Sequence, residues 1–160
     1  MAYLLDTNVF ITLKNEMPFD VFPSLWAKIE SFAVEGKLFS CIKVKDEIFC
    51  GNDDLREWCC THLPSTFFLQ EDSEIMSHYA HTIAWAVSNP VFTEAARREY
   101  ASVADAYLVA TAAAKSHTLV TFEKSNPLCQ RRVLIPDACI AAGVAFCTPI
   151  EMLRALGTHI

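Results

Sequence analysis

The sequence predicts an α/β fold, a single-domain three-layer α/β/α sandwich with a mostly parallel five-stranded sheet over residues 1–160. Short apolar segments suited to buried strands alternate along the chain with longer segments whose apolar residues recur every three or four positions, as in amphipathic helices. This alternation is typical of parallel strands joined by helical crossovers. A hydrophobic content of 52% in 160 residues is enough for the core of one such domain.

The first strand is expected at residues 3–6, an apolar segment without glycine or proline that ends at Asp6. Thr7 and Asn8 follow, and helical spacing resumes at Val9. Ligands of parallel sheets bind in the crevice outside the carboxyl ends of the strands, so Asp6 is a candidate site residue. Its alternative role is to cap the helix that follows, a position that Asp favours.

Caps and breakers delimit the remaining elements of the first half of the chain. Ser24 can cap a helix that Gly36 ends, with Leu25 and Ile29 at helical spacing. A cap at Asp72 and Ser73 opens a long helix. We expect the other elements here to be strands at residues 37–42 and 66–69, and helices from residue 44, at 55–62 and at 73–88.

The second half of the chain carries clearer helix signals. Pro136 suits the first turn of a helix that Gly143 ends. Thr148 and Glu151 form a capping-box pattern, so Glu151 is expected to be structural. The other elements expected here are helices at residues 93–100 and from 102 onward, strands at 118–121 and 144–147, and a final helix at 149–157.

Composition excludes several classes of function. A formal net charge of −6 argues against a protein that coats nucleic acid through many basic contacts, although a nuclease with an acidic metal site remains compatible with it. Four glycines form no phosphate-cradling loop, which excludes dinucleotide and P-loop proteins. The seven cysteines contain no C-x-x-C pair, so we expect buried free thiols. Without a membrane-length apolar run or a signal segment, the chain is expected to be soluble and cytoplasmic, with no membrane partner.

Three further carboxylates are expected near strand ends, at Glu47, Asp105 and Glu123. Each has an alternative. Glu47 could act only on a helix dipole, or Asp46 could be the functional acid in its place. Asp105 could form a capping box with Ser102, and Glu123 could be a solvated loop residue. Because three or four oxygen donors can hold a divalent cation where one cannot, the set of four predicts a metal site.

The ordered set of motifs resembles the PIN-domain nucleases, in particular the VapC-like toxins of prokaryotic toxin–antitoxin pairs. The resemblance spans nearly the whole chain and rests on Leu-Leu-Asp6-Thr7-Asn8, Glu47-x-x-x-Gly51, Ala104-Asp105 with Leu108-Val109-Ala110-Thr111-Ala112, and Leu-Val-Thr121-Phe-Glu123. Two features depart from the family's pattern. The fourth acid is Glu where many members have Asp, and residues 131–139 are longer and more basic than the simplest members need.

The resemblance implies a parallel α/β/α sandwich and metal-dependent cleavage of RNA at an acidic pocket. Carboxylates that surround a hard cation suit Mg²⁺ or Mn²⁺ better than zinc. We expect Asp6 and Asp105 to bind the principal cation and Glu47 to orient or deprotonate the water bound to that cation. Glu123 is expected to complete the coordination shell, either as a direct ligand or through another ligand. The residues expected to support the carboxylates and a phosphate oxygen are Thr7 or Asn8, and Thr121.

Partners and competing functions follow from the same residues. RNA is the expected substrate and an antitoxin protein a possible partner, and the high apolar content together with the resemblance predicts a homodimer. His78 and His81 have metal-ligand spacing but lack a third ligand. Candidate RNA-binding residues, which could equally be solvated surface charges, are Arg97, Arg98, Arg131 and Arg132. The competing functions are RNA processing without an antitoxin, an inactive PIN-like binding module, and an aspartyl-phosphate phosphatase, which Asn8 disfavours because those enzymes carry a second Asp there.

Overall fold

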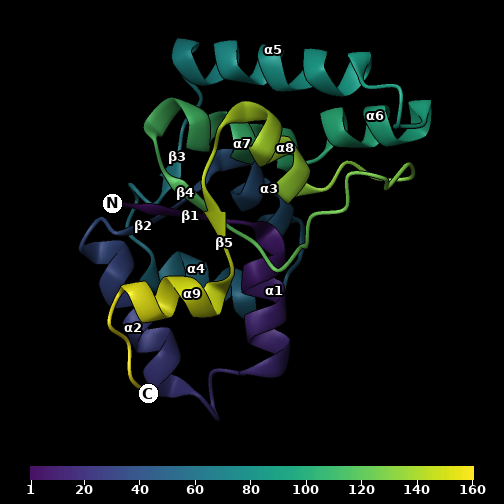
Figure 1. Ribbon diagram of the computed structural model, residues 1–160. Helices are drawn as coiled ribbons and strands as arrows, with labels where there is room; N and C mark the ends of the chain where they lie inside the picture. The colour runs from purple at the N-terminus through teal and green to yellow at the C-terminus, as the bar shows by residue number, and fades with distance from the viewer.

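Five parallel strands form the centre of the molecule in the computed structural model, which describes residues 1–160 (Figure 1). The strand order is β3-β2-β1-β4-β5, and every neighbouring pair is parallel. The predicted α/β fold with a five-stranded sheet is therefore confirmed. The strands are β1 (Tyr3–Leu5), β2 (Leu38–Cys41), β3 (Phe68–Leu69), β4 (Thr118–Val120) and β5 (Phe146–Cys147).

Helices cover both faces of this sheet. Figure 1 shows α3, α7 and α8 on one face, with α5 and α6 stacked outside them, and α1, α2, α4 and α9 on the other. The helices are α1 (Thr7–Glu16), α2 (Pro23–Val34), α3 (Ile42–Cys50), α4 (Asp54–His62), α5 (Ser73–Ser88), α6 (Glu94–Ser102), α7 (Asp105–Lys115), α8 (Ile135–Ala142) and α9 (Pro149–Ala155). No helix is both long enough and apolar enough to cross a bilayer.

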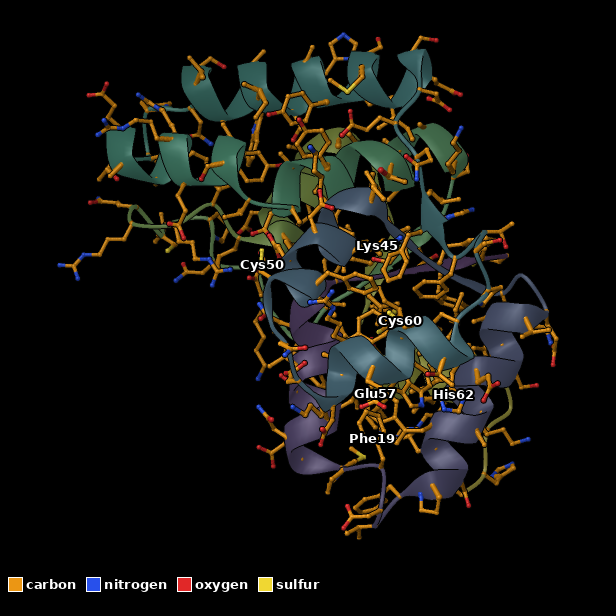
Figure 2. All side chains as sticks on the ribbon, turned by 180° about the vertical axis from the view of Figure 1, so that it is seen from behind. Phe19, Lys45, Cys50, Glu57, Cys60 and His62 are labelled. Carbon is orange, nitrogen blue, oxygen red and sulfur yellow. The ribbon has the colours of Figure 1, made fainter.

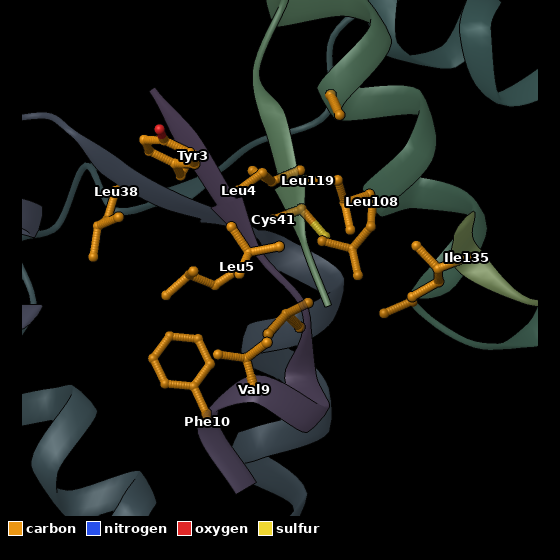
Figure 3. Close-up of a cluster of buried hydrophobic side chains, with 14 of the residues drawn as sticks. Tyr3, Leu4, Leu5, Val9, Phe10, Leu38, Cys41, Leu108, Leu119 and Ile135 are labelled. Carbon is orange, nitrogen blue, oxygen red and sulfur yellow. The ribbon is translucent and has the colours of Figure 1, made fainter. Parts of the chain in front are cut away.

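The central strands are buried between the two helical layers. Leu4 and Leu119 are fully buried, and Figure 3 shows Leu108 and Ile135 on one side of these strands with Phe10 on the other. One connected core of 37 buried residues includes all of them. Residues buried on both faces explain why the strands are continuous apolar runs and do not alternate with polar residues.

A second group of aromatic side chains lies under α4. Phe19, which Figure 2 labels below α4, contacts Trp26 with ring centroids 4.4 Å apart and stacks on Trp58 at 5.9 Å. Trp26 and Trp58 meet edge to face at 4.9 Å. These contacts fix the loop between α1 and α2 against the helical layer, so both loop and layer form one packed unit.

Several local expectations are confirmed. Thr148 and Glu151 form both hydrogen bonds of a capping box, which gives Glu151 the predicted structural role. Pro136 lies in the first turn of α8, and Gly143 ends that helix with a positive φ of 70° that favours glycine. All seven cysteines are free, as predicted, but they are not all buried, because Cys50 and Cys60 are exposed.

Two helix starts differ from the sequence-based expectation. Helix α3 begins at Ile42 and not near Val44, so Glu47 lies in its second turn. Ser102 belongs to the end of α6, where its hydroxyl donates to the Glu99 carbonyl at 2.9 Å. The alternative role of Asp105, a capping box with Ser102, is therefore wrong, because Ser102 belongs to another helix and α7 begins directly at Asp105.

The strand order reverses between β1 and β4. The chain adds β2 and β3 on one side of β1, and β4 and β5 on the other. Leu5 pairs with Val120, so Asp6 and Thr121 leave their strands at the same level of the sheet. Ligands of open α/β sheets bind at such a switch point, and the carboxylates lie at this edge.

Candidate active site

Asp6 is buried at the end of β1. Only 1% of the residue is exposed, and its Oδ2 accepts a hydrogen bond from the Thr121 hydroxyl at 3.1 Å. Asp6 occupies the N-cap position of α1, yet its carboxylate, although close to the Asn8 N–H, makes no capping hydrogen bond. The backbone of Asp6 is fixed as well, because its N–H donates to the Val120 carbonyl at 3.1 Å. The geometry thus favours a role toward the site over the alternative of a helix cap.

Asp105 opens α7, the alanine-rich helix that packs against the sheet. Its side chain is 14% exposed, and the residue before it, Ala104, is buried and is the N-cap. Neighbouring small residues such as Ala106 and Ala110 are fully buried, which lets α7 approach the strands closely. The start of this helix therefore carries the Asp105 carboxylate toward the carboxyl end of the sheet.

Glu47 joins two other elements through both of its carboxylate oxygens. Oε2 accepts a hydrogen bond from the Thr7 hydroxyl at 2.7 Å, and Oε1 accepts one from the Ala104 N–H at 2.9 Å. Asp46, its exposed neighbour, makes no contact of this kind. The sequence left open which of these two acids is functional, and these contacts favour Glu47.

Glu123 is more constrained than a solvated loop residue. Its Oε2 accepts a hydrogen bond from the Ile135 N–H at 2.7 Å, and its Oε1 lies 2.6 Å from the Arg132 guanidinium. Its own N–H donates to the Thr121 hydroxyl at 3.1 Å. With a side chain only 11% exposed, Glu123 lies on the site side of the loop after β4.

A pocket of about 160 Å³ opens beside these acids. Asn8, Glu47 and Asp105 line it, whereas Asp6 is buried behind it. The remaining lining residues come from α6, the α6–α7 junction and the loop before α8: Ala96, Glu99, Tyr100, Val103, Arg132 and Val133. The pocket is thus an acidic depression at the switch point of the sheet.

The carboxylates influence one another electrostatically. The pKa of Asp6 is raised to about 6, chiefly because burial removes water and then because Glu123 places a negative charge nearby; the hydrogen bond from Thr121 opposes this rise. The pKa of Asp105 is raised to about 7, again chiefly by burial, with further contributions from the charges of Asp6 and Glu123. Arg132 lowers the pKa of Asp105 and so partly offsets these effects. Acids whose pKa values are raised toward neutral pH by burial and by neighbouring charges are typical of functional sites.

The carboxylate oxygens are suitable ligands for a hard cation, but their present positions do not form a coordination site. As the side chains stand, no group of three or more His, Cys, Asp or Glu residues converges closely enough to hold a metal ion. The chemistry nevertheless suits one: the donors are carboxylate oxygens, Asp6 and Asp105 repel each other, and the positive Arg132 already lies between Asp105 and Glu123. Asp6, Asp105 and Glu123 are the residues that could hold Mg²⁺ or Mn²⁺ once their side chains rearrange.

The basic and histidine candidates lie in different settings. Arg97 donates to the carbonyls of Ala86 at 3.1 Å and Asn89 at 2.7 Å, so it closes the end of α5. Arg98 and Arg131 are exposed. His78 and His81 lie on α5, with ring centroids 6.2 Å apart. None of the four acids belongs to this helix.

The sequence did not predict that two charged residues, Glu99 and Arg132, line this pocket. Glu99 lines the pocket from α6, and its only sequence signal is that it lies six residues before Asp105. Arg132 was expected to bind RNA, but its guanidinium contacts two of the four acids. The loop that carries it has no hydrophobic periodicity, so nothing in the sequence shows which way its side chains point.

The fold and the site together define a parallel α/β protein with a carboxylate pocket at the switch point of its sheet. By sequence, the chain belongs to the family described as Domain of unknown function (DUF4411), which matches residues 3–160. Neither the curated proteins nor the solved structures contain a significant match to this chain.

Proposed function

We propose that this protein is a ribonuclease that hydrolyses RNA phosphodiester bonds at its carboxylate pocket with the help of Mg²⁺ or Mn²⁺. The observation that carries the proposal is the pair Asp6, which is buried, and Asp105, whose side chain is 14% exposed. Both have raised pKa values, and the charges of Glu47 and Glu123 act on both at the switch point. The resemblance of the four motifs to PIN-domain nucleases supports the same assignment.

We assign each acid a role in the reaction from the element that carries its side chain. A bound divalent cation would neutralise the phosphate, lower the pKa of an attacking water and stabilise the leaving oxygen. Asp6 and Asp105 would hold it, because their short side chains project from a strand end and a helix start. Thr121 fixes the orientation of the Asp6 carboxylate by its hydrogen bond.

Glu47 is suited to orient the attacking water. Each of its oxygens accepts one hydrogen bond, from Thr7 or from the Ala104 backbone, and keeps a second lone pair for a water in the pocket. Glu123 would complete the arrangement from the opposite loop, and Asn8 would reach a phosphate oxygen from the pocket wall.

Of the competing functions, the aspartyl-phosphate phosphatase fits these residues least. Such enzymes carry a second Asp two residues after the first, and here Asn8 occupies that place and lines the pocket. An inactive binding module is favoured by one observation, the contacts of Arg132 with two of the acids. An RNA-processing nuclease and a toxin would share the same pocket chemistry and differ only in substrate and partner.

We further propose that the protein is the toxin of a toxin–antitoxin pair and acts as a homodimer. Both proposals rest on the resemblance. A small antitoxin-like reading frame beside the gene would support the first, and its absence would favour RNA processing. Light scattering at micromolar concentration tests the second, and a mass of 17.9 kDa, that of one chain, would contradict it.

The central experiment is RNA cleavage by purified protein in Mn²⁺, in Mg²⁺ and in excess EDTA. We expect cleavage with either cation, none with EDTA, and a loss of at least about 100-fold in Glu47→Gln. Asp46→Asn is the matched control, because Asp46 is the adjacent exposed acid on the same helix. Undiminished cleavage in EDTA would disprove metal dependence, and RNA binding without cleavage would favour the binding module.

A further inference from the structure

Arg132 is the only positively charged residue that lines the carboxylate pocket. One guanidinium nitrogen, Nη2, lies 2.6 Å from Oε1 of Glu123 and 3.7 Å from Oδ2 of Asp105. The same nitrogen therefore serves two carboxylates that come from opposite sides of the site, the loop after β4 and the start of α7. A guanidinium shared in this way acts as a counter-ion for both acids.

The backbone around Arg132 is held on both sides. Val133 is 2% exposed, and the Gln130 carbonyl accepts a hydrogen bond from the Thr93 N–H at 3.0 Å. The side chain itself is 44% exposed, and no other group is bonded to its guanidinium. The loop thus delivers the guanidinium to a fixed place, while the long side chain retains room to turn out toward solvent.

The acids in contact with Arg132 are those that a metal would need. Oε1 of Glu123 and Oδ2 of Asp105 are the oxygens that Arg132 contacts, and a divalent cation and a guanidinium repel each other at short range. Glu123 would lose little on release, because its second oxygen stays bonded to the Ile135 N–H. The contacts of Arg132 can therefore be exchanged for those of a cation without dismantling the loop.

We propose that Arg132 is a built-in counter-ion of this pocket, which a divalent cation must displace from Glu123 and Asp105 before it can bind. The inference rests on the proposed function, since it concerns the same acids. It gives the side chain a positioning role: the guanidinium keeps the carboxylates from repelling one another when no cation is bound, and it lowers the apparent affinity for the cation through competition. This role differs from that of a surface arginine that only attracts RNA.

The test is Mn²⁺ binding to the purified full chain by isothermal titration calorimetry, at pH 8 and fixed ionic strength. Arg132→Gln removes the competing charge, so its dissociation constant for Mn²⁺ should fall about tenfold relative to wild type. Arg131→Gln is the matched control, with the same change in net charge at the adjacent exposed position, and it should stay within about twofold of wild type. Arg132→Lys, which keeps the charge but cannot present a planar fork, should lie between the two.

Melting temperature supplies a second readout that does not depend on cleavage. In chelator, Arg132→Gln should melt at a lower temperature than wild type, because its acids have lost their counter-ion, and excess Mn²⁺ should close that gap. An Mn²⁺ affinity in Arg132→Gln that equals or falls below that of wild type would overturn the inference alone. Failure of wild type to bind Mn²⁺ would overturn the inference and the proposed metal-dependent function together.

Discussion

Oε1 of Glu47 accepts a hydrogen bond from the Ala104 N–H at 2.9 Å, across 57 positions of the chain. Because Ala104 immediately precedes Asp105, this bond ties α3 to the place where a second candidate metal ligand enters the site. The other oxygen of Glu47 holds Thr7, the neighbour of Asp6. One side chain thus braces the residues next to both aspartates.

This brace predicts a combined loss of stability and activity for Glu47→Gln. The amide oxygen can still accept from the Ala104 N–H, but the NH₂ must then donate to the Thr7 hydroxyl, so that bond is reversed and both bonds lose the negative charge of the carboxylate. We expect a decrease of about 1–2 kcal/mol in the free energy of unfolding, measured by urea denaturation. Thr7→Val, which removes one bond and keeps the carboxylate, should cost less activity; an equal loss in both variants would show that Glu47 acts only as a brace.

Asp6→Asn and Asp105→Asn should separate chemistry from folding. Each should reduce RNA cleavage by orders of magnitude at saturating Mn²⁺, since a neutral amide is a poor ligand for a hard cation. Neither should lower the melting temperature in chelator at pH 8, because each substitution removes one of several crowded negative charges. If Asp105→Asn instead melts the protein and spares its cleavage, Asp105 is structural and the metal-site assignment is wrong.

The raised pKa values of these aspartates predict a pH dependence of stability. The folded-state pKa values of about 6 and about 7 exceed the ordinary value of 3.8, so the folded chain binds more protons than the unfolded chain between pH 4 and 7. The contribution of the two acids to stability should therefore fall as pH rises through this window, by on the order of a few kcal/mol in total.

Thermal denaturation in chelator from pH 4 to 8 measures this effect. Asp6→Asn and Asp105→Asn should each flatten the profile, and excess Mn²⁺ should flatten it at the upper end, where the ionised carboxylates bind the cation. A wild-type profile identical to that of Asp105→Asn would show that Asp105 titrates normally. Cleavage should rise over the same range, since only ionised carboxylates bind metal.

Substitution of Arg97 tests whether this RNA-binding candidate stabilises the fold or binds RNA. Its guanidinium donates to two carbonyls at the end of α5, so Arg97→Gln should lower the free energy of unfolding by about 1–2 kcal/mol. Arg98→Gln, a substitution at an exposed neighbour, should leave stability within about 0.5 kcal/mol of wild type. A fall in RNA affinity for Arg97→Gln without loss of stability, measured by filter binding and urea denaturation, would assign Arg97 to RNA.

The local pattern of the sequence was sufficient to predict the strands and the residues at their ends. Asp6 and Thr121 follow apolar runs that are buried on both faces, so their position at the sheet edge follows from the run itself. Glu47 was harder to place, because a two-residue error in the start of α3 changes which turn it occupies. The helix start depends on where β2 ends, and strand pairing, a long-range interaction, determines that end.

The place of Ser102 at the end of α6 and the role of Arg132 could not be predicted, for different reasons. Ser102 had two helices within reach, and only tertiary packing places it at the end of α6. Arg132 lies on a loop whose conformation is fixed by bonds to distant residues, such as that from the Thr93 N–H to the Gln130 carbonyl. Sequence periodicity carries no information about such bonds.

The position of β1 between β2 and β4 also has a consequence for the timing of biosynthesis. The hydrogen bond between Asp6 and Thr121 joins residues 115 positions apart, and Glu123 takes its backbone partner from Ile135. The chain must therefore be translated beyond residue 135 before the acidic pocket can assemble, and contacts so distant in sequence form slowly. A shorter nascent chain would carry these carboxylates without the geometry of the site.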